Sequence, residues 1–159
     1  MENEHSTSSD KDTEIEREQE VSMDKPTDVT RTPAADPTIA ADHFAARLSF
    51  ETDCRDVHQA ISTGKQDFVL LDVRSTKLFL AGHAAGAINL PHRAISSETL
   101  PPLGSRLCYV VYCAGPHCNG ADRAAARIAE LGLPVKIMIG GVEGWKDEGL
   151  PQESGAGSC

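Results

Sequence analysis

The chain has 159 residues, of which 40% are hydrophobic, so it allows one ordinary domain with a hydrophobic core. Its formal net charge is −9, but residues 1–38 hold eleven Asp and Glu against four Lys and Arg, whereas the rest holds thirteen against eleven. Neither part has the basic stripe of a nucleic-acid-binding protein, and we expect no nucleic-acid partner.

Residues 1–38 are rich in Glu, Asp, Ser, Thr and Pro, lack apolar periodicity, and are predicted to be a disordered acidic leader. The leader has neither the charged start nor the apolar stretch of a secretory signal, and no later window approaches the roughly 20 apolar residues of a membrane span. The five cysteines suit a reducing compartment better than a disulfide framework. We therefore expect a cytoplasmic protein without a membrane partner, whose leader is a solubilising tail or a partner-binding segment.

The ordered domain is expected from residue 39 to residue 151. Asp53 is placed to cap a short helix that Gly64 would stop. Residues 68–73 are almost uninterruptedly apolar, which is typical of a strand covered on both faces in a parallel sheet. Asp72 lies near the end of this strand and needs a partner, which Arg74 or backbone donors could supply.

Further elements follow in alternation. They are a short helix through residues 77–80 capped by Ser75, a strand at 86–91, a turn or short helix at 96–103, strands at 107–112 and 134–139, a helix at 142–148 with Trp145 in the core, and a flexible tail at 152–159. Strands that alternate with helices predict an α/β fold with a central, mainly parallel sheet flanked by helices on both faces.

Cys113 lies at the carboxyl end of the strand 107–112, and a turn-rich loop leads from it into a helix that begins near Ala121 and that Gly132 could cap. Loop N–H groups and the helix N-terminus would favour the thiolate of Cys113, with a pKa below the usual ~8.5. The same groups could bind a tetrahedral oxyanion such as thiosulfate, sulfate, phosphate or arsenate. Ligands lie beyond the carboxyl ends of strands in such sheets, so Cys113 is the candidate nucleophile.

Cys118 lies in the same loop, where a disulfide with Cys113, a sulfur relay and a merely space-filling role all remain open. Cys113, His117 and Cys118 could also bind a metal, but structural zinc sites use four ligands with paired spacings, so no metal and no other cofactor is expected. His83 and His92 have no ligand spacing and are expected to be structural or surface residues.

Several stretches in the same order resemble single-domain rhodanese-like sulfurtransferases. These are residues 70–74, 79–83 and 86–91, the Tyr112-Cys113 pair, and Gly140-Gly141 with Trp145, Gly149 and Pro151. The resemblance implies that Cys113 takes sulfane sulfur from thiosulfate or a related donor as a persulfide and passes it to a thiophilic acceptor, cyanide or a thiol, including a thiol of a protein. It also implies a donor-binding loop of Ala114, Gly115, His117, Cys118, Asn119 and Gly120, with Asp72 and Arg74 as supporting residues.

The loop departs from the family pattern. It is about two residues longer than the usual six-residue loop, and Asn119-Gly120 stand where a basic residue is expected. Wider loops resemble those of the cell-cycle phosphatases and arsenate reductases, but these have arginine as the sixth residue after cysteine, where this chain has Asn119. Two alternatives stay open: an oxyanion-processing relative of this arsenate reductase or phosphatase type, and a rhodanese-type protein-binding module, a class that commonly lacks the cysteine.

Overall fold

The structure is a computed structural model, which describes residues 25–156. Its backbone divides into two units, Met1–Ala40 and Ala41–Cys159. Most of the predicted leader, residues 1–24, lies outside the described residues, as does the end of the predicted tail, residues 157–159. Residues 25–36 form turns and bends, and the first described helix, α2 (Pro37–Phe50), begins two residues before the expected domain start at 39.

Five parallel strands form the central sheet in the order β1-β6-β5-β2-β4. They are β1 (Glu51–Thr52), β6 (Val135–Met138), β5 (Cys108–Tyr112), β2 (Phe68–Asp72) and β4 (Ile88–Asn89). All five residues of β2 are buried, because both faces of the sheet are covered. The predicted α/β fold with a mainly parallel sheet is confirmed.

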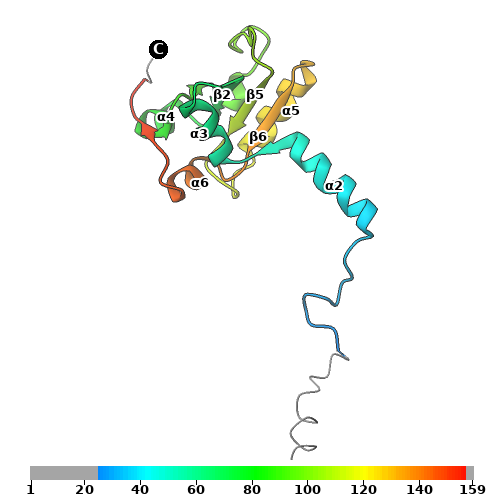
Figure 1. Cartoon of the computed structure of the whole chain (residues 1–159). Helices are drawn as coiled ribbons and strands as arrows, with labels where there is room; N and C mark the ends of the chain where they lie inside the picture. Colours follow the sequence, from blue (N-terminus) through cyan, green and yellow to red (C-terminus); the bar gives the residue numbers. More distant parts are fainter. Residues whose placement is uncertain (1–24, 157–159) are drawn as a thin grey trace, which may run out of the picture. The chain divides into compact units, whose positions relative to one another are not determined.

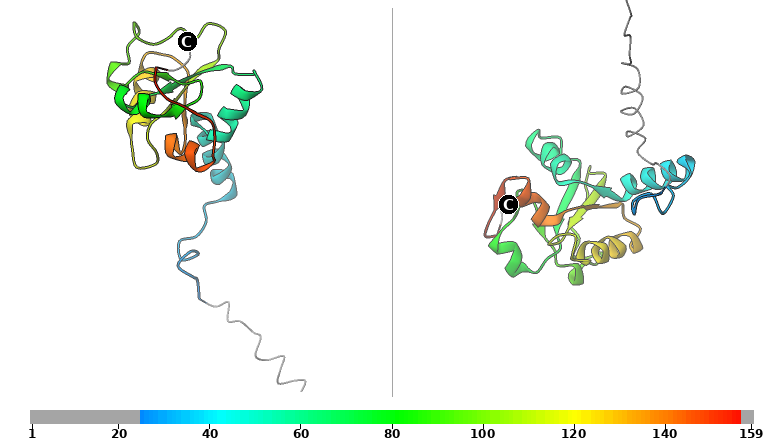
Figure 2. Two further views of the ribbon diagram at one scale, coloured as in Figure 1. Left: turned by 90° about the vertical axis from the view of Figure 1, so that its left-hand side faces the viewer. Right: turned by 90° about the horizontal axis from the view of Figure 1, so that it is seen from below.

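Helices cover both faces of the sheet (Figure 1). On one face α3 (Cys54–Ser62), α4 (Thr76–Ala81) and α6 (Gly141–Asp147) enclose a core that includes Trp145, which is fully buried as predicted. On the other face α5 (Gly120–Glu130) packs through Ala121, Ala124 and Ile128. The right-hand view of Figure 2 shows α5 and α6 on opposite sides of the sheet. The short 3-10 helix η1 (His92–Ala94) contacts α5 through a hydrogen bond from Arg127 to the His92 carbonyl.

The predicted helix ends are found at residues that cap a helix or adopt a positive φ angle. The Asp53 carboxylate accepts a hydrogen bond from the Asp56 N–H at 2.8 Å and caps α3. Gly64 and Gly132 follow α3 and α5 with φ angles of 69° and 77°, a conformation that strains any residue with a Cβ. Ser75 stands at the N-cap of α4, although its side chain makes no capping hydrogen bond.

A second, antiparallel pair of strands corrects the prediction at the C-terminus. β3 (His83–Ala84) pairs with β7 (Gln152–Glu153), so the expectation that the flexible tail begins at residue 152 is wrong for these two residues. The strand predicted at 86–91 shortens to β4, and β1 was not predicted at all. Strands of two residues carry no periodicity of their own and form only because a neighbouring strand supplies hydrogen-bond partners. Within residues 25–156 no helix is long and apolar enough to cross a membrane.

Candidate active site

Cys113 follows the central strand β5 directly, and its side chain is 7% exposed. The start of α6 holds the backbone at this point, because the Val142 N–H donates to the Cys113 carbonyl at 3.0 Å and the Glu143 N–H donates to the Ala114 carbonyl at 2.9 Å. The base of the loop is therefore anchored at both residues, while the loop itself runs on to Gly120 at the start of α5.

Gly141 permits this anchoring. Its φ is +60°, and a Cβ at this position would lie 2.5 Å from the Cys113 carbonyl oxygen. No side chain fits such a close approach between two backbones. The Gly140-Gly141 turn therefore lies directly against the base of the Cys113 loop.

Cys118 lies against Cys113. The two residues form a disulfide with a Cα–Cα distance of 6.4 Å, which is within the range of ordinary disulfides. Cys118 is half-buried and thus the more exposed partner. The sequence left open whether Cys118 forms a disulfide with Cys113, and the structure contains this disulfide.

Gly120 borders both sulfur atoms. A Cβ at Gly120 would lie 2.7 Å from the Cys113 Sγ and 3.4 Å from the Cys118 Sγ. The first of these distances is shorter than van der Waals contact allows, so any side chain here displaces the Cys113 sulfur.

We expect Gly120→Ala to slow alkylation of Cys113 in the reduced protein by roughly tenfold, because the added methyl group moves the sulfur from its place. The same substitution should leave the free energy of unfolding unchanged or raise it by up to about 1 kcal/mol, since alanine favours a helix over glycine. Alkylation resolved by peptide mass spectrometry, together with urea denaturation of the reduced protein, measures both effects. An unchanged alkylation rate would contradict the contact.

The loop amides are less available than the sequence suggested. The Cys118 N–H donates to the Gly115 carbonyl at 3.0 Å, and Pro116 has no N–H. The expectation that the whole loop from Ala114 to Gly120 can turn its amides toward an anion is therefore wrong for Cys118.

Two cavities adjoin the loop. One, of about 340 Å³, is lined by Cys113 and Cys118 together with the Gly140-Gly141 turn, and its charged lining residues are Glu51 and Asp122. The other, of about 580 Å³, is lined by loop residues including His117 and Asn119, again with Asp122. Sequence reasoning missed Glu51 and Asp122, although an acidic residue in the first turn of the helix after Cys113 is visible in the sequence.

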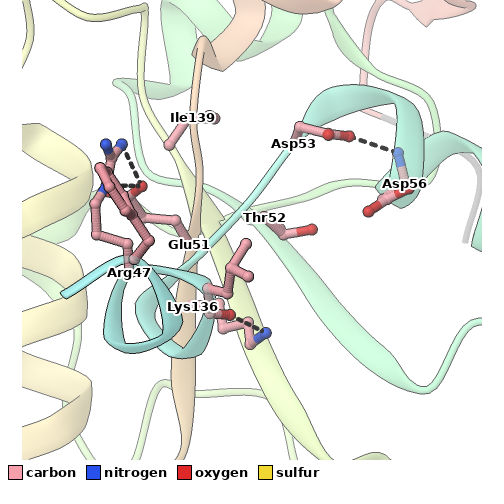
Figure 3. A pocket seen from close by; sticks show the side chains of 9 residues that line it. Arg47, Glu51, Thr52, Asp53, Asp56, Lys136 and Ile139 are labelled. Atoms are coloured by element: carbon pink, nitrogen blue, oxygen red, sulfur yellow. Dashed lines mark hydrogen bonds and ion pairs between the residues drawn. The ribbon is translucent and has the colours of Figure 1, made fainter. Parts of the chain in front are cut away.

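A third cavity, of about 470 Å³, shares Glu51 and Ile139 with the cavity at Cys113 and so adjoins it (Figure 3). Figure 3 shows Arg47 turned toward the Glu51 carboxylate, to which it donates two hydrogen bonds. Lys136 donates to the Leu48 carbonyl at 2.8 Å. The cationic groups of this cavity are thus already engaged within the protein.

Asp72 and Arg74 form a buried ion pair close to Cys113. The guanidinium of Arg74 contacts both carboxylate oxygens of Asp72 at 2.5 to 3.1 Å, and it also donates to the Gly82 carbonyl at 2.7 Å. Asp72 is the register partner of Tyr112, the residue before Cys113. Burial, followed by the charge of Asp72, raises the pKa of Tyr112 well above its usual value, and its neutral hydroxyl accepts a hydrogen bond from the Ala84 N–H. The predicted Asp72 partner is confirmed, whereas its supporting role stays a prediction.

The free cysteines among the described residues are Cys54 and Cys108. Burial, with smaller contributions from Glu148 and Asp53, raises the pKa of Cys54 to about 11, and its thiol donates to the Ile139 carbonyl. Burial also raises the pKa of Cys108. Both are therefore almost fully protonated at neutral pH and react slowly.

The two histidines that lacked a ligand spacing differ in their surroundings. His83 is fully buried, stacks on Phe79 with ring centroids 3.6 Å apart, and its Nδ1 lies 2.8 Å from the Phe79 carbonyl oxygen. Burial, together with Arg93, Arg123 and Arg127, lowers the pKa of His92. Within the described chain, no group of three or more His, Cys, Asp and Glu is placed to hold a metal ion.

Comparison with known proteins finds relatives by sequence and by structure. The chain is 34% identical to the HTH-type transcriptional regulator Rv0324 of Mycobacterium tuberculosis over 90 residues, which are 57% of this chain and 39% of the regulator. The BH2092 protein of Bacillus halodurans superimposes with a TM-score of 0.69 and 35% identity, covering 77% of this chain and 89% of that one.

Two more distant structures carry functional names. The thiosulfate sulfurtransferase of Pseudomonas aeruginosa has a TM-score of 0.54 and 25% identity, covering 68% of this chain and 20% of that one. The RPA3614 protein of Rhodopseudomonas palustris, described as a possible tyrosine phosphatase, has a TM-score of 0.56 and 26% identity, covering 76% of this chain and 97% of that one.

The family model of the rhodanese-like domain matches residues 53–148, a range that includes α3, the central sheet from β2 to β6, the Cys113 loop and α6. This range is more than half of the chain. The protein therefore belongs to the rhodanese-like domain family.

Proposed function

We propose that this protein is a sulfurtransferase that moves sulfane sulfur from thiosulfate or a related donor to a thiophilic acceptor through a persulfide on Cys113. The observation that carries the proposal is the place of Cys113: it follows the central strand, lines a cavity and stands at the loop that enters α5. The thiosulfate sulfurtransferase among the structural relatives supports the same class of reaction.

In the first half-reaction the Cys113 thiolate attacks the outer sulfur of thiosulfate, the S–S bond of the donor breaks, and sulfite leaves with its electron pair. In the second half-reaction the acceptor attacks the outer sulfur of the persulfide and the Cys113 thiolate returns. The N-terminus of α5 and the free amides of the loop favour the anionic sulfur in both steps. The reaction requires Cys113 in its reduced form, so the disulfide with Cys118 must first be opened.

Asp122 is expected to weaken the binding of anionic donors. It lines both cavities beside the loop, and its carboxylate repels a dianion such as thiosulfate. We expect Asp122→Asn to raise kcat/KM for thiosulfate by roughly fivefold at low salt, with the gain shrinking as ionic strength rises. Steady-state kinetics in a salt series measures this effect.

Asp67→Asn is the matched control, because this exposed carboxylate precedes β2 at the amino end of the sheet, away from Cys113. It removes the same charge from the protein, and kcat/KM should stay near the wild-type value. Equal gains from both substitutions would show an effect of net charge alone and would contradict a local role for Asp122.

The phosphatase and arsenate reductase alternative is less well supported. Phosphoryl chemistry uses a fixed cation at the oxyanion, whereas the sixth residue after Cys113 is Asn119 and the charged residues that line the two loop cavities are carboxylates. A protein-binding role is the other alternative, for which the similarity to part of a transcriptional regulator is the supporting observation. We also retain the cytoplasm as the predicted location, and a thiol protein as a candidate acceptor.

The deciding experiment is the intact mass of the fully reduced Cys118→Ser variant before and after thiosulfate, because this variant has no second thiol beside Cys113. A gain of one sulfur atom that cyanide removes, and that peptide mapping places on Cys113, is the expected result. The high pKa values of Cys54 and Cys108 make them internal controls, because both should stay unmodified. No gain with thiosulfate or an organic persulfide as donor would favour the oxyanion or protein-binding alternatives.

A further inference from the structure

The loop that contains the nucleophile Cys113 also contains a second cysteine, Cys118, whose sulfur atom is bonded to that of Cys113. Cys113 and Cys118 are joined in the structure, and both sulfur atoms pack on the backbone of Gly120. In the same structure, the backbone N–H groups of Val142 and Glu143 anchor the base of the loop. Cys118 therefore reaches the Cys113 sulfur while the hydrogen bonds that anchor the loop base are in place.

We propose that Cys118 resolves the Cys113 persulfide and releases its outer sulfur as sulfide, so that the protein reduces sulfane sulfur at the expense of an external dithiol. This inference rests on the proposed function, because it needs the persulfide on Cys113. It adds a reaction that simple transfer to cyanide or a thiol does not include.

The step balances in atoms and electrons. The Cys118 thiol passes its proton to the anionic outer sulfur of the persulfide, and the Cys118 sulfur attacks the inner sulfur, which is the Cys113 Sγ. The bond from this Sγ to the outer sulfur breaks, the outer sulfur leaves as HS⁻ with the bonding pair, and the disulfide forms. The outer sulfur is thereby reduced, and the two cysteines are oxidised together. A dithiol of the external reductant then reopens the disulfide and becomes a disulfide itself. With thiosulfate as donor, the products of one turnover are sulfite, sulfide and the oxidised dithiol.

The different exposure of the two cysteines favours attack of the external dithiol on Cys118 rather than on Cys113. Cys118 is half-buried and lines both loop cavities, whereas Cys113 is 7% exposed and lines one. An incoming dithiol thus meets the Cys118 sulfur first and forms a mixed disulfide there. Cys113 is then the leaving thiolate, which the N-terminus of α5 stabilises. Each reduction accordingly returns the nucleophile in its reactive form.

The charge of the site supports an internal acceptor. Of the charged residues that line the two cavities, Glu51 is paired with Arg47, and Asp122 disfavours the approach of an anionic acceptor such as cyanide or sulfite. Cys118 is already in place and brings no net charge from solution. The intramolecular reaction also avoids the entropy cost of binding a second substrate.

The test is a single turnover of the reduced full-length protein, freed of reductant and then given thiosulfate. The wild-type protein should release one sulfide per chain, trapped with a bimane reagent, and its mass should fall by two hydrogen atoms as the disulfide forms. Added dithiothreitol should convert this burst into continuous sulfide release. Cys118→Ser should gain one sulfur atom, keep it, and release no sulfide until a thiol is supplied.

Cys108→Ser is the matched control, because this cysteine lies at the start of β5 away from the loop and should behave as the wild type. A wild-type protein that keeps the added sulfur, or a Cys118→Ser variant that releases sulfide at the wild-type rate, would overturn the inference while leaving the proposed function intact. Sulfur found on Cys118 by peptide mapping would likewise overturn it in favour of a relay. No sulfur on any variant, Cys118→Ser included, would contradict the proposed function and the inference together.

Discussion

Replacement of Cys113 by serine is expected to abolish sulfur transfer, with a loss of more than about a thousandfold in turnover from thiosulfate to cyanide. The serine hydroxyl is not ionised at neutral pH and forms no persulfide, while its size preserves the packing at the end of β5. The rate of thiocyanate formation and the absence of a sulfur adduct in the intact mass check this expectation. Full turnover by Cys113→Ser would refute the assigned mechanism.

Two comparisons separate chemistry from folding in this experiment. All proteins are compared under reducing conditions, because the variant also lacks the Cys113–Cys118 disulfide. Under these conditions the thermal midpoint of Cys113→Ser should stay close to that of the wild type. Cys108→Ser, which removes a thiol of raised pKa outside the loop, should keep its activity.

Replacement of Asp72 by alanine is expected to cost about 3 to 5 kcal/mol of unfolding free energy. Asp72 is fully buried and Arg74 is 7% exposed, so loss of the carboxylate leaves a buried guanidinium whose remaining described partner is the Gly82 carbonyl. The Arg74 charge then lies in a largely buried place without its counterion, which is costly. Chemical denaturation of the reduced protein measures the loss.

The double variant Asp72→Ala/Arg74→Ala tests the reason for the loss. If the unpaired charge dominates, the double variant should be more stable than Asp72→Ala alone, because no buried charge remains. Glu98→Ala removes an exposed carboxylate in a turn and should change stability by less than about 0.5 kcal/mol. A loss below about 1 kcal/mol for Asp72→Ala would show that Arg74 finds solvent and that the pair contributes little.

The elements that the sequence predicted correctly are those with a local signal. Phe68–Asp72 and Cys108–Tyr112 are short apolar runs rich in β-branched and aromatic residues, and each forms a buried strand. Asp53, Gly64 and Gly132 mark helix ends because a capping carboxylate or a positive φ acts within one turn of the chain. Such features need no information about distant residues.

The elements that were missed depend on partners far along the chain. β1 forms because Glu51–Thr52 meets β6, and β7 forms because Gln152–Glu153 meets β3. Two residues have no period to detect, and the backbone hydrogen bonds that define these strands exist only once the sheet has assembled. The acidic lining of the Cys113 cavity has the same origin, since Glu51 and Asp122 come together from β1 and α5.

By itself, then, the sequence determined the α/β class, the place of Cys113 at a strand end and the presence of Cys118 in the same loop, because all of these follow from residues close to one another along the chain. Only the tertiary structure decided that Cys118 touches Cys113, that the Gly141 backbone holds the loop, and that carboxylates rather than cations line the cavity. Each of these features depends on how the loop folds and on which distant residues the packed sheet and helices bring together. A local sequence pattern contains no information about such contacts.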